Sequence, residues 1–176
     1  EEGVSPALLF MIRPVLLVPD PRLKEVCAPV ENFDSALADL VQDLEDTRRH
    51  HTACVGVAAP QIGAMLRVAI VDTSQHKKFS AQSSGHQVLI NPEIIQQSGE
   101  RLGREGCLSL PDFTANVQRA GQIKVRFQDL QGNWHELETE EFEAVVVQHE
   151  LDHLDGILFL DRVANLATDV FRRKVK

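Results

Sequence analysis

Hydrophobic residues follow a helical spacing in two long segments of the chain. The first segment begins after a capping residue, Asp34 or Ser35, and its apolar positions recur every three or four residues: Leu37, Leu40, Val41 and Leu44. This pattern fades at 48–51, where two arginines are followed by two histidines. The second segment runs from about Glu140 to Leu154, with Thr139 as its expected N-cap. We therefore predict two helices, each with a buried apolar face.

Strands are predicted where β-branched or alternating apolar residues cluster, at 15–18, 67–73, 88–95 and 123–127. The turn at Gln131-Gly132 predicts a hairpin, whose second strand contains Trp134 and Leu137. A polar stretch from Ser74 to His86 is expected to form an exposed loop. Most of these strands are joined by local turns, which is typical of antiparallel pairing.

Together the segments predict an α+β fold, in which mainly antiparallel sheets pack around the central helix at 140–154. A C-terminal helix is expected to carry four further apolar residues: Val163, Leu166, Val170 and Phe171. The 176 residues fit a single domain. Because Met11 follows shortly after Glu1, we expect residues 1–10 to be a leader or an expression remnant and 11–176 to form the single domain.

Composition narrows the classes of partner. A net charge of -8 disfavours nucleic acid, since phosphate binding requires clustered lysine and arginine, so no sequence-specific nucleic acid is expected. The apolar stretch at 7–18 is shorter than the ~20 residues of a membrane span, so no membrane partner is expected. Three scattered cysteines do not form a secreted disulfide pattern, which predicts a reducing, cytoplasmic location: Cys27, Cys54 and Cys107.

The predicted central helix carries the sequence His149-Glu150-Leu151-Asp152-His153, an HExxH motif. Residues four apart in a helix lie on one face, so both imidazoles can reach one metal ion. Glu150 is turned away enough to hold the water on the metal instead of the metal itself. The alternative is that two core histidines with other partners flank an incidental glutamate.

A catalytic site of the zinc type needs a third protein ligand and an open position. The extended motif HExxHxxGxxH has Phe159 where its third histidine belongs, and no glutamate follows Glu150. Asp161 and Asp169 remain possible ligands. Cys107 is a softer candidate in a loop bounded by glycine and proline, although a lone cysteine is more often an inert buried side chain.

Three segments resemble the sequence boxes of peptide deformylases, in the order found in that family. Cys54–Gln61 resembles the box GxGxAAxQ, Glu105–Ser109 resembles EGCLS, and His149–Gly156 resembles HExDHLxG. The resemblance extends from about Met11 to the C-terminal helix. It implies a metal-dependent hydrolase that removes the formyl group from N-formylmethionyl peptides on nascent chains and releases formate.

The resemblance also implies a role for each matched residue. Ligands of the ion would be Cys107, His149 and His153, and the ion would usually be Fe2+, although Zn2+, Ni2+ or Co2+ can occupy the site. Glu150 would take a proton from the water on the ion, whose pKa is lowered toward about 7, and pass it to the departing amine. The side chain of Gln61 and the amide of Leu108 would stabilise the oxyanion.

Further residues are expected to line the substrate pocket or to support the predicted ligands. An apolar pocket for the methionine side chain is expected from four residues, for which core packing is an equal alternative: Val55, Gly56, Val145 and Val146. Asp152 is expected either to orient a ligand histidine or to lie exposed. Glu105 and Arg119 can pair to brace the cysteine loop.

One position departs from the family pattern, because Cys54 stands where the first glycine of GxGxAAxQ belongs. Its side chain could narrow the substrate cleft or change the φ angle of the loop, which puts substrate preference in doubt more than the reaction. A second thiol ligand at Cys54 is not expected, since three ligands are already assigned.

Two rival functions remain: a metallopeptidase that cleaves internal peptide bonds, and a structural zinc site in a protein without catalysis. The basic tail offers one further partner, because Arg172, Arg173, Lys174 and Lys176 lie close together. These cations either complement the dipole of the last helical turn or contact an acidic partner such as the ribosome.

Overall fold

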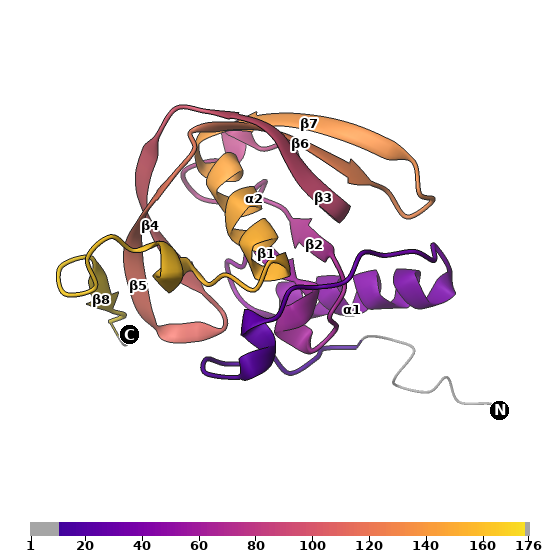
Figure 1. The fold of residues 1–176 in the computed structure, drawn as a ribbon, viewed down its shortest axis with the longest axis horizontal. Coiled ribbons are helices and arrows are strands. Elements are labelled where there is room, and N and C mark those ends of the chain that lie inside the picture. The colour runs from indigo at the N-terminus through magenta and orange to yellow at the C-terminus, as the bar shows by residue number, and fades with distance from the viewer. Residues whose placement is uncertain (1–10, 175–176) are drawn as a thin grey trace.

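The computed structural model describes residues 11–174, and its ribbon is drawn in Figure 1. The predicted leader at 1–10 lies outside the described residues. A five-stranded antiparallel sheet has the order β1-β2-β3-β6-β7. Its strands are Gly56–Ala58, Val68–Val71, Gln87–Ser98, Gln122–Gln128 and Trp134–Glu140. The strands predicted at 67–73, 88–95 and 123–127 and the hairpin after 131–132 are thus confirmed.

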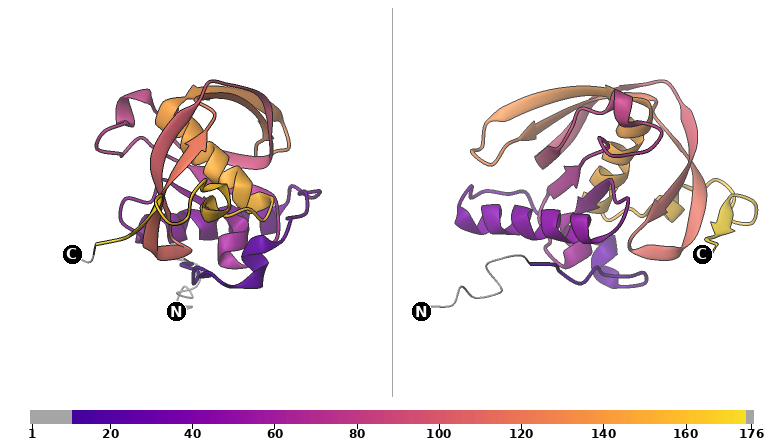
Figure 2. Two further views of the ribbon diagram at one scale, coloured as in Figure 1. Left: turned by 60° about the vertical axis from the view of Figure 1, so that its left-hand side comes forward. Right: turned by 180° about the vertical axis from the view of Figure 1, so that it is seen from behind.

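A second, three-stranded antiparallel sheet has the order β4-β5-β8. Its strands are Arg101–Cys107, Leu110–Arg119 and Val170–Arg172. The β4–β5 hairpin was not predicted, because glycines and charged residues interrupt its apolar alternation. In Figure 1 and Figure 2 this sheet lies on one side of α2, while β3, β6 and β7 curve past the other.

Two helices pack on the strands. In α1 (Ser35–His50) the carboxylate of Asp34 accepts a hydrogen bond from the Leu37 amide at 3.1 Å, which confirms Asp34 as the N-cap. The apolar face of α1 packs on β1 and β2. Helix α2 (Glu141–Leu154) contains the HExxH residues, and most of its side chains are buried. One face packs against β2, β3 and β6 in a cluster that includes Val147 and Leu151.

Three short 3-10 helices connect these elements: η2 (Pro21–Lys24), η3 (Ala59–Ile62) and η5 (Phe159–Arg162). A fourth, η4 (Ser80–Gln82), lies in the polar loop predicted at 74–86. That loop is held to α2 by Glu143, whose carboxylate accepts hydrogen bonds from the amide and the hydroxyl of Ser84. Neither helix of the described chain has the length and apolar character that crossing a membrane requires.

The strand predicted at 15–18 does not form. The Leu16 amide donates to the Gln61 carbonyl at 2.7 Å, and the Val18 amide donates to the Ser109 carbonyl at 2.8 Å. Because these bonds reach two different segments, the extended chain joins no ladder. It instead ties together the loops that carry Gln61 and Ser109.

Two predictions about helices were wrong: the N-cap of α2 and the helix at the C-terminus. Thr139 lies in β7, and the helix begins after Glu140. The Thr139 hydroxyl donates to the Glu143 carboxylate at 2.8 Å instead of capping the helix. The predicted C-terminal helix is absent from the described chain: residues 163–169 are irregular, and 170–172 form β8 on β5. An open sheet edge and a packing site for Val170 beside Phe159 outweigh the helical spacing.

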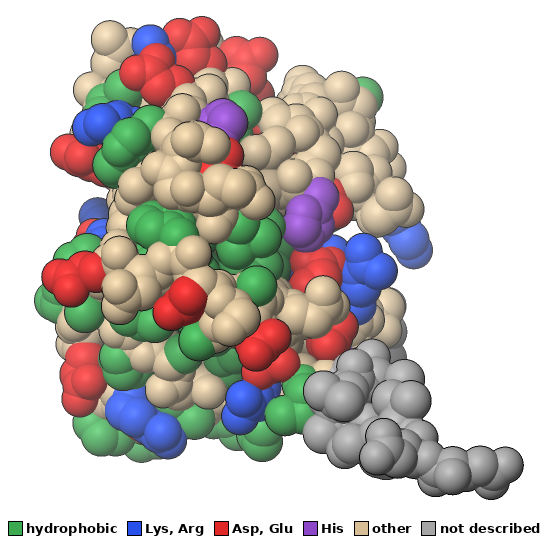
Figure 3. All heavy atoms as spheres, turned by 90° about the vertical axis from the view of Figure 1, so that its right-hand side faces the viewer, with side chains coloured by type: hydrophobic (Ala, Val, Ile, Leu, Met, Phe, Trp, Pro, Cys, Tyr) green, Lys and Arg blue, Asp and Glu red, His purple; other side chains and the backbone are tan. Residues whose placement is uncertain are grey.

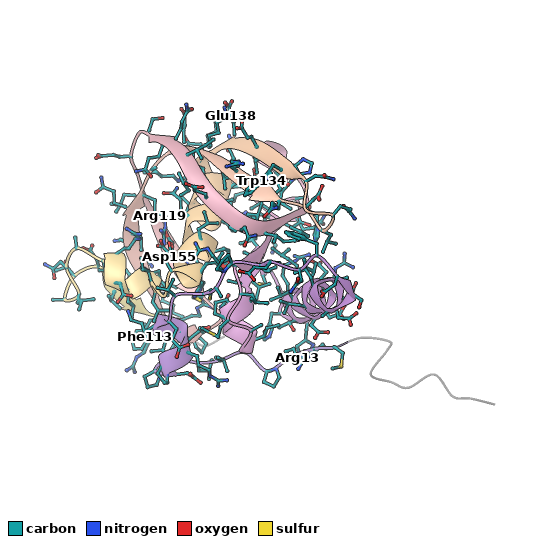
Figure 4. All side chains as sticks on the ribbon, turned by 45° about the vertical axis from the view of Figure 1, so that its right-hand side comes forward. Arg13, Phe113, Arg119, Trp134, Glu138 and Asp155 are labelled. Carbon is teal, nitrogen blue, oxygen red and sulfur yellow. The ribbon has the colours of Figure 1, made fainter. Side chains whose placement is uncertain are left out.

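Charged side chains of both signs are scattered over the face drawn in Figure 3, with apolar patches between them. Figure 4 shows Trp134 and Glu138 on the outer hairpin and Arg119 beside α2. Glu150 and His153, by contrast, are buried in the second half of α2.

Candidate metal centre

Three potential metal ligands converge at the C-terminal half of α2. His149 and His153 are one helical turn apart, and their ring centroids lie 5.1 Å apart. Cys107, at the end of β4, brings its Sγ atom to 3.3 Å from Nε2 of His153. One ligand atom from each of the three residues lies within 4.8 Å of the others. The two sheets thus bring a residue distant in sequence onto the histidine-bearing face of the helix.

A buried chain of charges supports this cluster from behind. Nδ1 of His149 lies 2.8 Å from Oε1 of Glu105. Arg119 donates two hydrogen bonds to Glu105, at 2.6 and 2.9 Å, and a third to Asp152 at 2.9 Å. Arg162 donates two hydrogen bonds to Asp152, at 2.6 and 2.9 Å. Asp152 is 7% exposed, so the alternative that it lies on the surface is wrong.

These contacts decide the ionisation of Glu105. Burial opposes the charged form, but hydrogen bonds from His149 and Arg119 hold the pKa of the Glu105 carboxyl below its ordinary value. The carboxylate therefore accepts the Nδ1 proton of His149, which leaves Nε2 of that ring to face the cluster.

Glu150 lies next to the cluster with one oxygen free. Glu150 is 3% exposed, and its Oε2 atom has no hydrogen-bond partner among the described residues. The other oxygen lies 3.9 Å from Nε2 of His149. Burial raises the pKa of Glu150 to about 7. A carboxylate in this environment is suited to hold or release a proton on a molecule that enters the site.

Gly56 allows the backbone of β1 to approach Glu150 closely. A Cβ atom at Gly56 would lie 3.0 Å from Cγ and 3.2 Å from Oε2 of Glu150. Any side chain there would press on the carboxylate.

Gln61 reaches the cluster from η3. Its Oε1 accepts a hydrogen bond from the Ala58 amide at 3.0 Å, and its Nε2 donates to Cys107 Sγ at 3.4 Å and Ser109 Oγ at 3.1 Å. Leu108 and Ser109 form the turn between β4 and β5, so the Leu108 amide directly follows Cys107. Both predicted oxyanion donors are therefore next to the sulfur.

The donor set fits a transition-metal ion. One cysteine sulfur and two imidazole nitrogens suit zinc or iron better than magnesium or calcium, and three ligands leave an open position. Burial lowers the pKa of His153 well below its ordinary value, so the ring is neutral and can offer a lone pair.

Comparison with known proteins identifies the family. The sequence pattern of the polypeptide deformylase family matches residues 12–169. The chain belongs to the peptide deformylase family. It is 42% identical over 167 residues to a peptide deformylase of Acidobacterium capsulatum, with 95% of each chain covered. It is 41% identical over 166 residues to one of Bartonella tribocorum, with 94% of this chain and 92% of the relative covered.

Solved peptide deformylases have the same fold. The crystal structure from Legionella pneumophila matches with a TM-score of 0.80 and 40% identity, covering 88% of each chain. A class I type b peptide deformylase from Acinetobacter baumannii, crystallised with Met-Ala-Ser bound, matches with a TM-score of 0.81 and 36% identity. That match covers 87% of this chain and 99% of the other. The protein is therefore an enzyme of the deformylase type, which favours this activity over the metallopeptidase and the structural zinc site.

The family-atypical Cys54 is accommodated without strain at its own position. The positive φ angle in this loop, 60°, belongs to Ala53. The Cys54 thiol donates to the Gly56 carbonyl at 3.1 Å, and burial raises its pKa to about 12. Cys54 is not part of the ligand group, which contains Cys107 as its sulfur donor. The substitution thus places a protonated thiol beside the β1 backbone at Gly56.

The proposed methionine pocket stays a prediction. Val55 and Val146 pack in the apolar cluster on the five-stranded sheet, and Val145 is buried. Core packing therefore accounts for part of their apolar surface.

Three residues near the centre were missed by sequence reasoning. Ser109 binds Gln61, Arg162 binds Asp152, and the Phe159 ring stacks on His149 with centroids 5.9 Å apart. Phe159 occupies the place of a third histidine in another HExxH class, and that position was a usable signal. The other two contacts have no local sequence pattern, since they depend on where η5 and the β4–β5 turn lie.

Proposed function

We propose that this enzyme removes the N-formyl group from the N-terminal methionine of nascent polypeptides and releases formate. Cys107, His149 and His153 hold one divalent ion, and Glu150 transfers protons. The observation that carries this proposal is the free Oε2 of buried Glu150 beside three converging ligand atoms.

The ion, when bound, lowers the pKa of a water molecule toward about 7 and so provides a nucleophile at neutral pH. We propose Fe2+ in the cell, with Zn2+, Ni2+ or Co2+ able to occupy the same ligands in purified protein. Glu105 fixes the tautomer of His149 by accepting its Nδ1 proton, and the neighbouring Arg119 keeps that carboxylate charged.

Glu150 moves the proton that the reaction requires. Its Oε2 accepts a proton from the attacking water as the oxygen bonds to the formyl carbon. The same oxygen then gives this proton to the methionine nitrogen as the carbon–nitrogen bond breaks. Formate and a free amino terminus are the products, and Glu150 returns to its starting charge.

Gln61 and the Leu108 amide stabilise the negative charge that develops on the formyl oxygen. Preorganised donors of this kind typically contribute about 3 to 4 kcal/mol each. The Gln61 amide is held by Ala58 and Ser109, and the N–H that points to the Cys107 sulfur is the one that would donate to the formyl oxygen instead.

The substrate is proposed to lie in an extended form between β1 and β4. Its methionine side chain would contact Val55, Gly56, Val145 and Val146. Because the Acinetobacter baumannii relative was crystallised with Met-Ala-Ser, we propose peptides of this class for the present enzyme. Three free cysteines support a reducing, cytoplasmic setting. Ribosome contact through the basic tail remains a proposal, with β8 in place of the expected helix.

The decisive experiment combines metal analysis with an assay of formate release from formyl-Met-Ala-Ser and acetyl-Met-Ala-Ser. We expect strong preference for the formyl peptide. Glu150→Ala should retain one ion per chain and lose about 100-fold or more in kcat. Glu138→Gln, an exposed change on β7, is the control. Full turnover by Glu150→Ala would remove this residue from the mechanism, and equal cleavage of both peptides would refute deformylation.

A further inference from the structure

The side chain of Arg173, the residue after β8, reaches across to β4. The Arg173 amide donates to the Asp112 carbonyl at 2.7 Å, which continues the pairing of β8 with β5. Its guanidinium crosses β5 and lies against Gly106 of β4, where any Cβ atom would collide with it. A Cβ atom at Gly106 would also lie 3.5 Å from the methyl carbon of Thr114. Arg173 is thus packed against the residue that precedes Cys107.

The Arg173 guanidinium has no carboxylate partner among residues 11–174. It forms no ion pair and donates no side-chain hydrogen bond within this part of the chain. Nearby Arg104, by contrast, donates to Asn116 at 3.3 Å and lies 3.7 Å over the Phe171 ring. A guanidinium carries five donors in a planar fork that matches a carboxylate. An exposed arginine without a partner is therefore available to a ligand.

The strand beneath Arg173 also has a free edge. Among the strands of residues 11–174, β4 pairs only with β5, and β1 pairs only with β2. Gly56 of β1 lies against Glu150, and Glu105 of β4 binds His149, so both free edges flank the same turn of α2. An extended peptide can add to such edges through its backbone. Gly106 has no side chain, so a peptide that follows β4 can approach Arg173 closely.

We propose that Arg173 is a specificity-determining residue that binds a carboxylate in the part of the substrate following formyl-methionine. This proposal rests on the deformylase function above. The carboxylate comes either from the C-terminus of a short peptide or from an aspartate or glutamate side chain in a longer one. The enzyme therefore favours acidic sequences after methionine.

The test uses three tripeptides: formyl-Met-Ala-Ser with a free carboxylate, the same peptide as its C-terminal amide, and formyl-Met-Ala-Asp amide. Kinetics are compared for the wild type, Arg173→Gln and the matched control Arg172→Gln, which removes a neighbouring exposed cation from β8. We expect Arg173→Gln to raise KM about 5- to 10-fold for the two peptides with a carboxylate, with kcat unchanged. The uncharged amide should change less than about 2-fold.

Ionic strength provides a second measurement. Added salt should raise the wild-type KM for the free acid, and Arg173→Gln should lose this dependence, because an exposed ion pair is screened. Arg173→Lys should restore part of the preference, since it keeps the charge but not the fork.

Two results would overturn the assignment. Equal losses for charged and uncharged peptides would mean that Arg173 only supports the loop, and equal effects of Arg172→Gln would mean that the preference comes from general surface charge. Calorimetric binding of unformylated Met-Ala-Ser and its amide makes the same comparison without turnover. Failure of the wild type to release formate would refute the deformylase function, whereas the binding difference would still decide the role of Arg173.

Discussion

Nδ1 of His149 lies 2.8 Å from Oε1 of Glu105, and this contact joins a proposed metal ligand to a buried ionic network. Arg119 binds Glu105 and Asp152 together, and Arg162 closes the network at the surface. The helix face and the β4 strand are thereby held in one relative position. The orientation of the His149 ring depends on residues from four separate elements.

The first prediction concerns Glu105→Gln. The neutral amide is a weaker acceptor for the His149 proton and leaves Arg119 with less opposing charge, so affinity for Zn2+ should fall about 10- to 100-fold. Competition with a coloured chelator measures this directly, without activity. Glu136→Gln, on the exposed outer strand, is the control. Unchanged zinc affinity in Glu105→Gln would show that the network does not support the ligand.

The second prediction concerns Gly56→Ala. The added Cβ would lie 3.0 to 3.2 Å from the Glu150 side chain, so the carboxylate must shift. We expect kcat for formyl-Met-Ala-Ser to fall about 10-fold or more while the metal content stays at wild-type level. The matched control is Gly103→Ala in β4, where a Cβ has no neighbour within 4 Å. Equal activity of the two variants would contradict a close β1–Glu150 contact.

The third prediction concerns pH and Glu45, a buried carboxylate on α1. Burial opposes its charge, but hydrogen bonds from Arg48, His86 and Arg49 lower its pKa to about 2. Because the folded pKa lies below the unfolded value, the stabilisation is full above about pH 4.5 and is lost as the pH falls toward 2. It should amount to about 2 to 3 kcal/mol at pH 7.

Urea unfolding of metal-stripped protein tests this effect, since acid would otherwise also release the ion. Glu45→Gln should unfold more easily than the wild type at pH 7, and the difference should shrink between pH 4.5 and 3. Asp39→Asn, an exposed change on the same helix, should show less than about 0.5 kcal/mol throughout. A constant difference across this pH range would mean that Glu45 acts through packing and not through charge.

The fourth prediction concerns oxygen. If Fe2+ is the ion, a sulfur ligand at Cys107 and an oxidisable metal should make the enzyme lose activity in air. Iron-loaded protein should lose most of its activity within days of aerobic storage, whereas nickel-loaded protein keeps it. Stable activity of the iron form would refute the iron assignment.

Much of the site could be predicted from short-range pattern. The spacing of His149 and His153 places both rings on one face once a helix forms there, and the apolar stripe predicts that helix. Helix α1 and its Asp34 cap follow from the same kind of signal. Such predictions succeed because backbone sterics and side-chain periodicity act within a few residues.

The errors share a different cause. The spacing of Val163, Leu166 and Val170 is that of a helix. In the structure, however, Val170 lies in β8 and pairs with Ala115 of β5, because that edge of β5 is open to another strand. Thr139 has a side chain that could cap a helix, but its hydroxyl donates a hydrogen bond to the Glu143 carboxylate instead. Residues 15–18 form no ladder, because Gln61 and Ser109 accept their amide protons.

By itself, the amino-acid sequence determined which residues could act: the paired histidines, the glutamate between them and the cysteine of a separate box. Only the tertiary structure decided that the Cys107 sulfur meets His153, that Arg119 and Arg162 brace Asp152, and that Arg173 lies over Gly106. Local spacing sets the direction of side chains within one element. Contacts between distant elements depend on how whole sheets and helices pack, and no short stretch of the chain encodes that.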